Sequence, residues 1–424
     1  MHLSPVALFL MLVTALAASA ARAADEPPDD ASALQLADQA PAETQKASAW
    51  RMYGEAAASR GWQRSPASTG DGVRASFDLR YDGTLAPGLR AVLSDRLDLL
   101  HDNSQPDQHN VNALREAYVS WKFRPDVTFD LGRVNLRHGA AWGYNPTDYF
   151  KSGALRSIVS PDPASLRENR LGTVLVQAQK VWSDSSFSAA LAPKLADAPS
   201  DAAASLDLGA TNAHSRWLLA ASHNFGAGFD PQVLLHGGDG TPTQVGLNLS
   251  GLLNSATVGF VEFSTGKGRS LRAQALDLAE SDKWQQRAAL GVTVTTSFNL
   301  SLTAEADYSS AAPDRAEWDA LRTSAPLAGL RLLGTAQTLQ ELPTRRGAFF
   351  YATWHDAFIR RLDLSGFVRQ DLVTHSRAQW LESRYHWDRA DLALQWQLYS
   401  GGSDTVYGTV PQNRAVELSL RVYF

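Results

Sequence analysis

Residue types that commonly catalyse reactions or hold metal ions are scattered through this 424-residue sequence. Of its ten histidines, His214, His223 and His236 fall on separate expected strands or at their ends, and no His-Glu-x-x-His segment occurs. The chain has no cysteine, which excludes disulfides, thiolate metal sites and a lipid-modified N-terminal cysteine. We therefore expect neither a metal site nor a cofactor.

Catalytic motifs are approached but not completed. Gly266-Lys267-Gly268-Arg269 lacks the glycine five residues before Gly266 that a phosphate-binding loop needs, and no Gly-x-Ser-x-Gly segment is present. Separate strands can still bring a serine, a histidine and an aspartate together, and His386 with Asp388 is one such pair. A hydrolase stays open as an alternative, although we expect the chain not to be an enzyme.

The stretch from 131 to 170 gathers groups suited to binding rather than catalysis. Arg133, Asn135 and Arg137 alternate at its start, and Asn145-Pro146-Thr147-Asp148 is a turn signature, because proline fixes φ and asparagine and aspartate bond to nearby backbone. Ser165-Leu166-Arg167-Glu168 could open a short helix. From 137 to 170 basic residues outnumber acidic ones, with Arg137, Lys151, Arg156, Arg167 and Arg170 against Asp148, Asp162 and Glu168.

This stretch includes a long connection, 138–170, with turns of its own, and such connections are usually functional. If it folds into a lumen, it forms a slightly basic constriction. If it stays outside, its charges face water. The strand before it shows an irregularity, since Phe129 and Leu131 share parity with Arg133. Either the strand leaves an apolar band at Gly132, or a bulge there switches the two faces.

The elements that must position these residues are short alternating strands. In Val73–Tyr81, every second residue is apolar, and the residues between are Arg74, Ser76, Asp78 and Arg80. About 18 such strands can be read, or 16 if some are wrongly split. They are Trp50–Trp62, Val73–Tyr81, Leu89–Leu99, Leu114–Phe123, Val127–Arg137, Leu171–Trp182, Ser186–Leu191, Trp217–Phe225, Asp230–His236, Val245–Leu253, Ala256–Phe263, Ala288–Thr296, Leu300–Tyr308, Ala348–Trp354, Leu362–Asp371, Gln379–Trp387, Leu392–Leu398 and Val416–Phe424.

The gaps between these strands alternate in length. Short turns such as 124–126 and 254–255 follow every second strand, and longer gaps such as 138–170 and 310–345 fall between them. Short turns on one side and long loops on the other indicate a transmembrane antiparallel β-barrel rather than a soluble sandwich, which alternation alone cannot exclude. The fold class is therefore all-β, with long external loops and short periplasmic turns.

The last strand supports a closed barrel. Val416, Leu418, Leu420, Val422 and Phe424 share one face, and the chain ends on that aromatic residue. A strand that closes a membrane barrel must stay ordered to its end, because closure removes the sheet edge. We expect this strand to pair with the first one.

The beginning of the chain reads as an export signal. An apolar run from Val6 to Ala18 precedes Ala21-Arg22-Ala23, which has the form of a cleavage site, so 1–23 is expected to be a signal peptide. Residues 24–46 form a polar leader in the periplasm, and 47–424 form the barrel. The net charge of −5 argues against a nucleic-acid partner.

Gly132, Arg133, Asn145, Pro146 and Asp148, together with the C-terminal Phe strand, resemble porin-like families of the bacterial outer membrane. The resemblance rests on these two segments, and the rest of the chain shares only its texture. It implies an 18-stranded-type channel through which small solutes, anionic ones among them, diffuse. A barrel for export or lipid handling, with the leader docking periplasmic partners, stays open as an alternative.

Such a channel would select solutes by lumen charge and hydrogen bonding. The candidate pore and constriction residues are Arg133, Asn135, Arg137, Asp148, Lys151, Arg156, Arg74, Arg80, Glu116, Lys122, Arg361 and Arg369. The expected partners are outer-membrane lipid, small solutes and, through the C-terminal strand, the barrel-assembly machinery. The solute and the oligomeric state are not predicted.

Overall fold

A computed structural model describes residues 48–64, 68–102, 110–226, 228–324 and 327–424, so the predicted signal peptide and leader lie outside the described residues. One sheet of 18 strands makes up most of the chain, and each predicted strand overlaps one of them. They are β1 (Trp50–Gln63), β2 (Thr69–Ala86), β3 (Leu89–Asp102), β4 (Val111–Arg124), β5 (Val127–Val134), β6 (Thr173–Val181), β7 (Ser185–Ala192), β8 (Arg216–His223), β9 (Gln232–Gly238), β10 (Thr241–Asn254), β11 (Thr257–Gly268), β12 (Lys283–Thr295), β13 (Leu300–Ser309), β14 (Arg346–Trp354), β15 (Leu362–Asp371), β16 (Ser376–His386), β17 (Ala390–Ser400) and β18 (Gln412–Tyr423).

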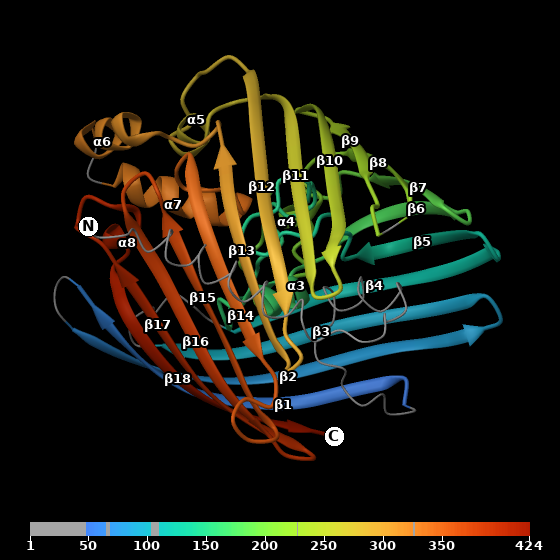
Figure 1. Cartoon of the computed structure of the whole chain (residues 1–424), viewed down its shortest axis with the longest axis horizontal. Helices are drawn as coiled ribbons and strands as arrows, with labels where there is room; N and C mark the ends of the chain where they lie inside the picture. The colour runs from blue at the N-terminus through green and yellow to red at the C-terminus, as the bar shows by residue number, and fades with distance from the viewer. Residues whose placement is uncertain (1–47, 65–67, 103–109, 227, 325–326) are drawn as a thin grey trace.

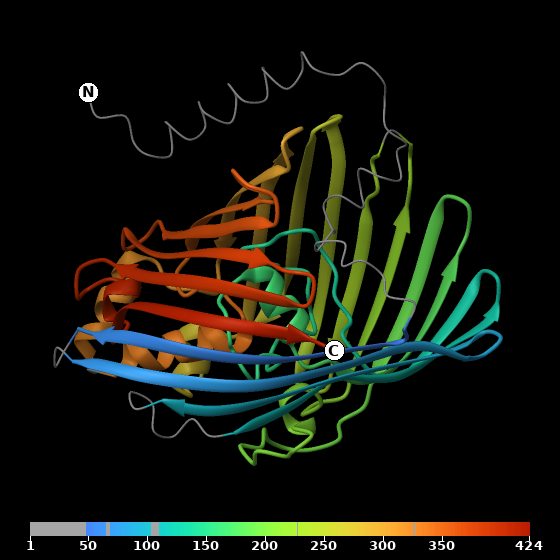
Figure 2. The same ribbon diagram turned by 90° about the horizontal axis from the view of Figure 1, so that it is seen from below.

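The sheet closes on itself, as the last strand predicts. Each strand pairs antiparallel with its neighbour in the chain, and β1 also pairs with β18, from Tyr53 opposite Tyr423 to Gln63 opposite Gln412. The backbone amide of Phe424 adds a bond of 3.1 Å to the carbonyl of Met52. Figures 1 and 2 show the resulting barrel, with the first strands in blue beside the last in red.

The barrel is apolar outside and polar inside. On β2, Val73 and Phe77 are 56% and 45% exposed, whereas Arg74 and Asp78 between and beside them are only 8% and 2% exposed. The same reversal holds on β18, where Leu418 is exposed and Ser419 is buried. A soluble sandwich buries its apolar stripe, so this arrangement distinguishes a membrane-type barrel from one. The predicted fold class is confirmed.

Connection lengths alternate between the two ends of the barrel, as predicted. The short-turn end carries links such as Pro87 and Gly88 between β2 and β3, where Gly88 has a φ of 77° that suits glycine. The long-loop end carries the β5–β6 connection, 135–172, the β7–β8 connection, 193–215, and the β13–β14 connection, 310–345.

The helices lie in the long connections. They are α3 (Pro163–Asn169), α4 (Leu208–Thr211), α5 (Leu271–Ala275), α6 (Arg315–Ser324), α7 (Ala328–Leu339) and α8 (Val406–Thr409). Among the described residues, none of them has the length and apolarity to cross a bilayer.

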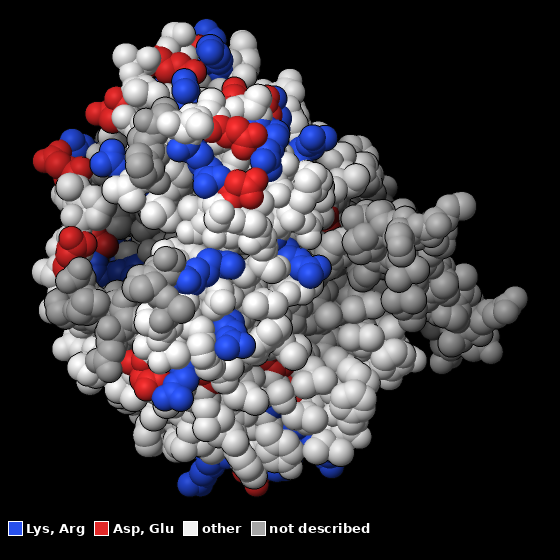
Figure 3. Space-filling model, turned by 90° about the vertical axis from the view of Figure 1, so that its left-hand side faces the viewer, with Lys and Arg blue, Asp and Glu red and all other residues white. Residues whose placement is uncertain are grey.

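Four of these helices form a cap at the long-loop end. Leu271, Trp318, Leu332 and Val406, from α5, α6, α7 and α8, share one buried apolar cluster (Figure 1). On the outside of the cap, Arg315 pairs with Asp319 and Asp404. Acidic and basic side chains accordingly lie side by side on the upper part of this face (Figure 3).

Candidate functional site

The β5–β6 connection, 135–172, lies inside the barrel. Its Ser157 donates to Asp98 on β3 at 2.8 Å, its Ser160 donates to Gln395 on β17 at 3.2 Å, and its Asp162 accepts from Tyr351 on β14 at 2.7 Å. Because inward-facing side chains of three separate wall strands reach it, the loop can occupy only the lumen. Figure 2 shows the loop within the ring of strands. Of the two placements that the sequence leaves open, the inward one is observed.

Two wall carboxylates hold the loop through its backbone. Glu262 on β11 accepts from the amide of Ala141 at 2.7 Å, and Glu305 on β13 accepts from the amides of Trp142 and Gly143 at 2.6 and 2.8 Å. Each acceptor is charged, and charge-assisted bonds of this kind are about twice as strong as neutral ones. We call these contacts the carboxylate latch.

Gly139 lets the backbone approach the latch. Its φ is 89°, and a Cβ atom there would lie 2.4 Å from an oxygen of Glu262. An L residue at this position is therefore strained both by its backbone conformation and by the collision.

Apolar contacts fix the other parts of the loop. Phe150 joins a buried cluster with inward residues of β5 to β9, among them Leu175, Leu218 and Leu234. Tyr149 stacks on His236 with ring centroids 4.7 Å apart. The loop therefore rests on an apolar patch of the inner wall and covers it from water.

The face of the loop near β14 is aromatic. Trp142 packs against a buried cluster of Phe349, Tyr351, Phe367 and Trp380, and its ring centroid is 5.6 Å from that of Tyr351. The guanidinium of Arg167 lies 3.7 Å from the centroid of the Trp142 ring. A cation held over an indole in this way contributes to the position of both groups.

The predicted turn in the loop is present. The side-chain oxygen of Asn145 accepts from the amides of Thr147 and Asp148 at 3.2 and 3.0 Å. The expected short helix is α3, which begins at Pro163 rather than Ser165, and Asp162 caps it by accepting from the amide of Ser165 at 3.0 Å.

Most predicted constriction residues of the loop are engaged in holding it. Asp148 pairs with Arg170, and both are buried. Arg156 pairs with Asp207 of the β7–β8 connection at 2.7 Å. Asn135 donates to the carbonyl of Arg167 at 3.1 Å. These pairs neutralise much of the positive charge that the loop sequence carries.

Lys151 joins the loop to the helical cap. Its ammonium lies 3.3 Å from Glu341, which follows α7, and Arg287 and the hydroxyl of Tyr144 also contact this carboxylate at 3.3 and 2.6 Å. Burial acts to raise the pKa of Glu341, but the charges of Lys151 and Arg287 and the Tyr144 bond outweigh it and hold the pKa below its usual range.

We expect Lys151→Met to lower the free energy of unfolding by about 3 kcal/mol at pH 7, because it removes one partner of a buried ion pair. A carboxylate with a lowered folded pKa stabilises the fold above its unfolded pKa and loses that effect as pH falls through the folded value. The deficit should therefore shrink when unfolding by urea in lipid vesicles is repeated at pH 4. Lys194→Met, which breaks an exposed pair with Asp197, is the control and should change little.

The end of β5 decides between the two readings of Gly132. The strand ends at Val134, and the pairing of β5 with β6 runs without a register shift. Arg133 therefore keeps the outward parity of Leu131, yet it is only 3% exposed because its side chain bonds the carbonyls of Leu114 and Asp207. The strand leaves the apolar band at Gly132. Arg137, by contrast, lies half-buried in the loop.

Candidates on the barrel wall fall into different surroundings. Arg80 on β2 is partly exposed and lies 3.8 Å from Glu116 on β4. Lys122 is exposed at the short-turn end of β4. Arg369 on β15 lies over the ring of Phe349, 5.2 Å from its centroid. Arg361 is not on a strand, because it belongs to the β14–β15 turn and pairs with Asp388 at 2.8 Å.

Arg74 belongs to a buried charge network that the sequence reading did not identify. The carboxylate of Glu55 on β1 contacts Arg74 on β2, Arg96 on β3 at 3.2 Å and Arg421 on β18 at 3.0 Å. Arg115 on β4 extends it through Asp78 at 2.8 Å. We call this set the seam network, since it crosses the strands on both sides of the closure.

His386 and Asp388 do not form the pair considered for a hydrolase. The ring nitrogens of His386 face Asp391 at 2.9 Å and Asp363 at 3.3 Å, whereas Asp388 pairs with Arg361. Among the residues that the structure covers, no group of three or more His, Asp or Glu side chains could hold a metal ion.

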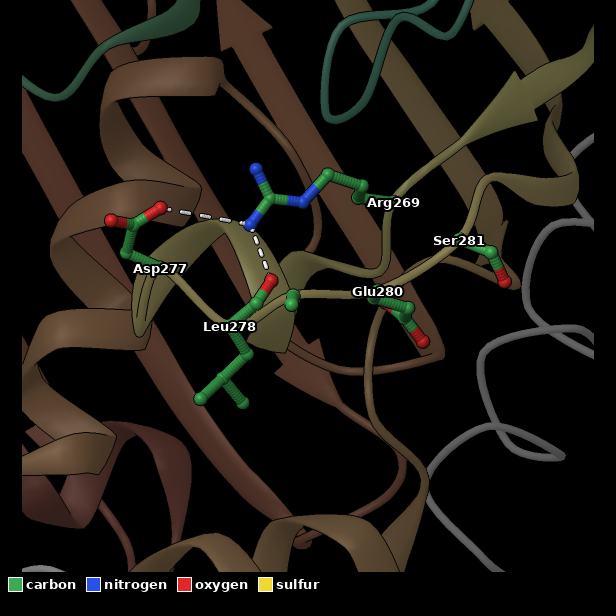
Figure 4. A pocket seen from close by; sticks show the side chains of 6 residues that line it. Arg269, Asp277, Leu278, Glu280 and Ser281 are labelled. Atoms are coloured by element: carbon green, nitrogen blue, oxygen red, sulfur yellow. Dashed lines mark hydrogen bonds and ion pairs between the residues drawn. The ribbon is translucent and has the colours of Figure 1, made fainter.

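A pocket of about 620 Å³ lies outside the lumen, in the β11–β12 connection, and its lining includes Arg269 and Glu280 (Figure 4). Arg269 donates to the carbonyl of Leu278 at 2.6 Å and lies 3.8 Å from Asp277. Its charge is committed to its own loop, as the reading of this glycine-containing segment as a solvated loop suggests.

No protein-family model matches the chain, and no curated protein matches it. Solved outer-membrane porins share its fold. OccAB1 of Acinetobacter baumannii matches with a TM-score of 0.56 and 9% identity, over 88% of this chain and 96% of OccAB1. OpdL of Pseudomonas aeruginosa matches with a TM-score of 0.53 and 10% identity, over 89% and 99% of the two chains. OccK2 of the same species, solved with glucuronate, matches with 0.52 and 9%, over 88% and 97%.

Proposed function

We propose that the protein is a porin-like channel of the bacterial outer membrane, through which small solutes diffuse. The observation that carries the proposal is a closed barrel of 18 strands, apolar outside and polar inside, with a loop latched across its lumen. Barrels of 16–18 strands leave an aqueous channel, and a loop inside such a channel sets its width and selectivity. No chemical step is needed, and we propose that the chain is not an enzyme.

The same proposal assigns roles to the two segments that resemble porin-like families. Gly132, Asn145, Pro146 and Asp148 shape the start and the turn of the constriction loop. The outward residues of the last strand, Val416, Leu418, Leu420, Val422 and Phe424, close the wall and are the part that the barrel-assembly machinery would recognise. A signal peptide at 1–23 and a leader at 24–46 complete the proposed domain organisation.

Conductance in a planar lipid bilayer tests the channel directly. The purified full-length protein should insert and give discrete current steps, because water and ions fill the lumen beside the loop. A folded protein, recognised by its heat-modifiable mobility on gels, that inserts without conducting would contradict the proposal and favour a barrel for export or lipid handling.

We further propose that anionic solutes are favoured. Arg80 is the wall candidate that supports this, since its side chain is 31% exposed and its carboxylate neighbours Asp82 and Glu116 lie no closer than 3.8 Å. OccK2, which shares the fold, was solved with glucuronate, a carboxylate.

Arg80→Gln should therefore lower the anion preference, measured as the reversal potential in a potassium chloride gradient. Arg331→Gln removes one charge from the exposed surface of α7 and is the matched control, for which no shift is expected. A wild-type reversal potential that indicates cation preference would contradict this part of the proposal.

A further inference from the structure

The β14–β15 turn carries an exposed apolar tip on the outside of the barrel. Phe358 and Ile359 are 77% and 57% exposed. The ring of Phe358 packs against Trp354, with centroids 4.6 Å apart, and Trp354 also contacts Phe298 at 6.0 Å. Trp354 pairs with Leu300 and Leu364 and shares their outward parity. The tip therefore extends the aromatic belt that barrels place at the membrane interface.

This turn is rigid, although its tip is exposed. Ala357 is fully buried, and its amide donates to the carbonyl of Leu362 at 2.6 Å. The amide of Arg361 donates to the side chain of Asp356 at 2.6 Å. Asp356, Phe358 and Arg361 all have φ between 53° and 70°, a conformation that residues other than glycine rarely adopt. Strained backbone held by its surroundings clusters at binding sites.

Arginines surround the tip and come from two adjacent turns. Arg360 and Arg361 follow Ile359, and Arg389 lies in the β16–β17 turn. The two turns are tied together by the Arg361–Asp388 pair at 2.8 Å and by the bond from the amide of His386 to the carbonyl of Arg361 at 2.9 Å. Arg360 and Arg389 are exposed, and neither forms an ion pair with any residue that the structure describes.

The combination is specific to this pair of turns. The β8–β9 turn also exposes aromatic residues, Phe225 at 67% and Phe229 at 44%, but the segment 223–232 contains no basic residue apart from His223. Apolar anchoring alone therefore does not require the arginines of the β14–β15 turn.

We infer that the patch formed by Trp354, Phe358, Ile359, Arg360 and Arg389 binds the headgroup and upper acyl chains of an anionic phospholipid in the periplasmic leaflet. Phe358 and Ile359 would contact the acyl chains, as aromatic and aliphatic residues do at the interface. Arg360 and Arg389, at the same depth, would neutralise the phosphate. The inference rests on the proposed membrane location of the barrel but not on conduction.

Native mass spectrometry of the detergent-solubilised full-length protein tests this inference. With equal amounts of dioleoyl-phosphatidylglycerol and dioleoyl-phosphatidylcholine added, the wild type should retain the phosphatidylglycerol preferentially. The double variant Arg360→Gln/Arg389→Gln should bind phosphatidylglycerol about 30-fold more weakly, if each arginine contributes as basic residues do near an anionic membrane. Phe358→Ser should weaken the retention of both lipids.

Arg331→Gln is the matched control, because it removes one charge at the opposite end of the barrel, and it should bind phosphatidylglycerol as the wild type does. Heat-modifiable mobility confirms that each variant is folded. Equal retention of the two lipids by the wild type, or unchanged retention by the double arginine variant, would overturn the inference. A protein that conducts but shows no lipid preference would refute this site and leave the channel proposal intact.

Discussion

Removing the constriction loop is expected to raise the single-channel conductance severalfold. A variant in which a short glycine-serine linker replaces residues 139–169 keeps the β5–β6 pairing, which extends to Val134 opposite Thr173. The wall should therefore stay closed while the lumen loses its main obstruction. In a water-filled barrel of this strand number, the width that remains then follows from the wall alone.

A milder variant separates obstruction from anchoring. Glu262→Ala with Glu305→Ala removes the carboxylate latch and leaves the amides of Ala141, Trp142 and Gly143 without their acceptors. We expect noisy current with steps between the wild-type and loop-deletion levels, because Phe150 and Trp142 still hold other parts of the loop. Glu168→Gln changes only an exposed pair with Arg51 and should conduct as the wild type does. Unchanged conductance after loop deletion would contradict the assigned constriction.

Glu55→Ala is expected to destabilise the barrel by about 3–5 kcal/mol, because removing one member of a buried ion network leaves its partners uncompensated. Glu55 is 7% exposed and faces Arg74, Arg96 and Arg421, so three guanidinium groups would lose their shared carboxylate. The free energy of unfolding can be measured by urea titration in lipid vesicles. The variant should also convert to the unfolded gel mobility at a lower temperature.

The matched control for Glu55 is Asp126→Asn at the short-turn end. Asp126 lies 3.9 Å from Lys180, and both side chains are nearly half exposed. Such pairs contribute little. If Glu55→Ala and Asp126→Asn lowered stability equally, the seam network would not have the stabilising role assigned to it.

The barrel could be predicted from the sequence because its information is local. Period-2 alternation marks each wall strand, and the alternation of turn and loop lengths gives the order and the closure. Strand ends were less certain: Val127–Arg137 was predicted, but β5 ends at Val134, where the chain turns into the lumen. A strand reading cannot detect this departure, because the alternating polar residues Arg133, Asn135 and Arg137 continue the pattern beyond it.

The site was predicted only in part. Asp148, Lys151 and Arg156 do lie in the lumen loop, but their partners, Arg170, Glu341 and Asp207, are set by contacts between separate connections. Glu262, Glu305 and Glu55 were missed. Each lies on an inward face of an alternating strand, so parity could have marked them as lumen residues. Which of the inward carboxylates meets the loop backbone depends on the path of the loop, which no local pattern specifies.

The central claim, that loop 135–172 lies in the lumen of the conducting protein, can be tested with one disulfide. Thr147 in the loop and Asn248 on β10 have side-chain oxygens 2.7 Å apart, and the chain contains no cysteine. We expect the Thr147→Cys/Asn248→Cys protein to form this disulfide on oxidation. Its single-channel conductance should be the same before and after reduction, because the loop is already in place. Failure to form the disulfide, or a large rise in conductance on reduction, would contradict the account.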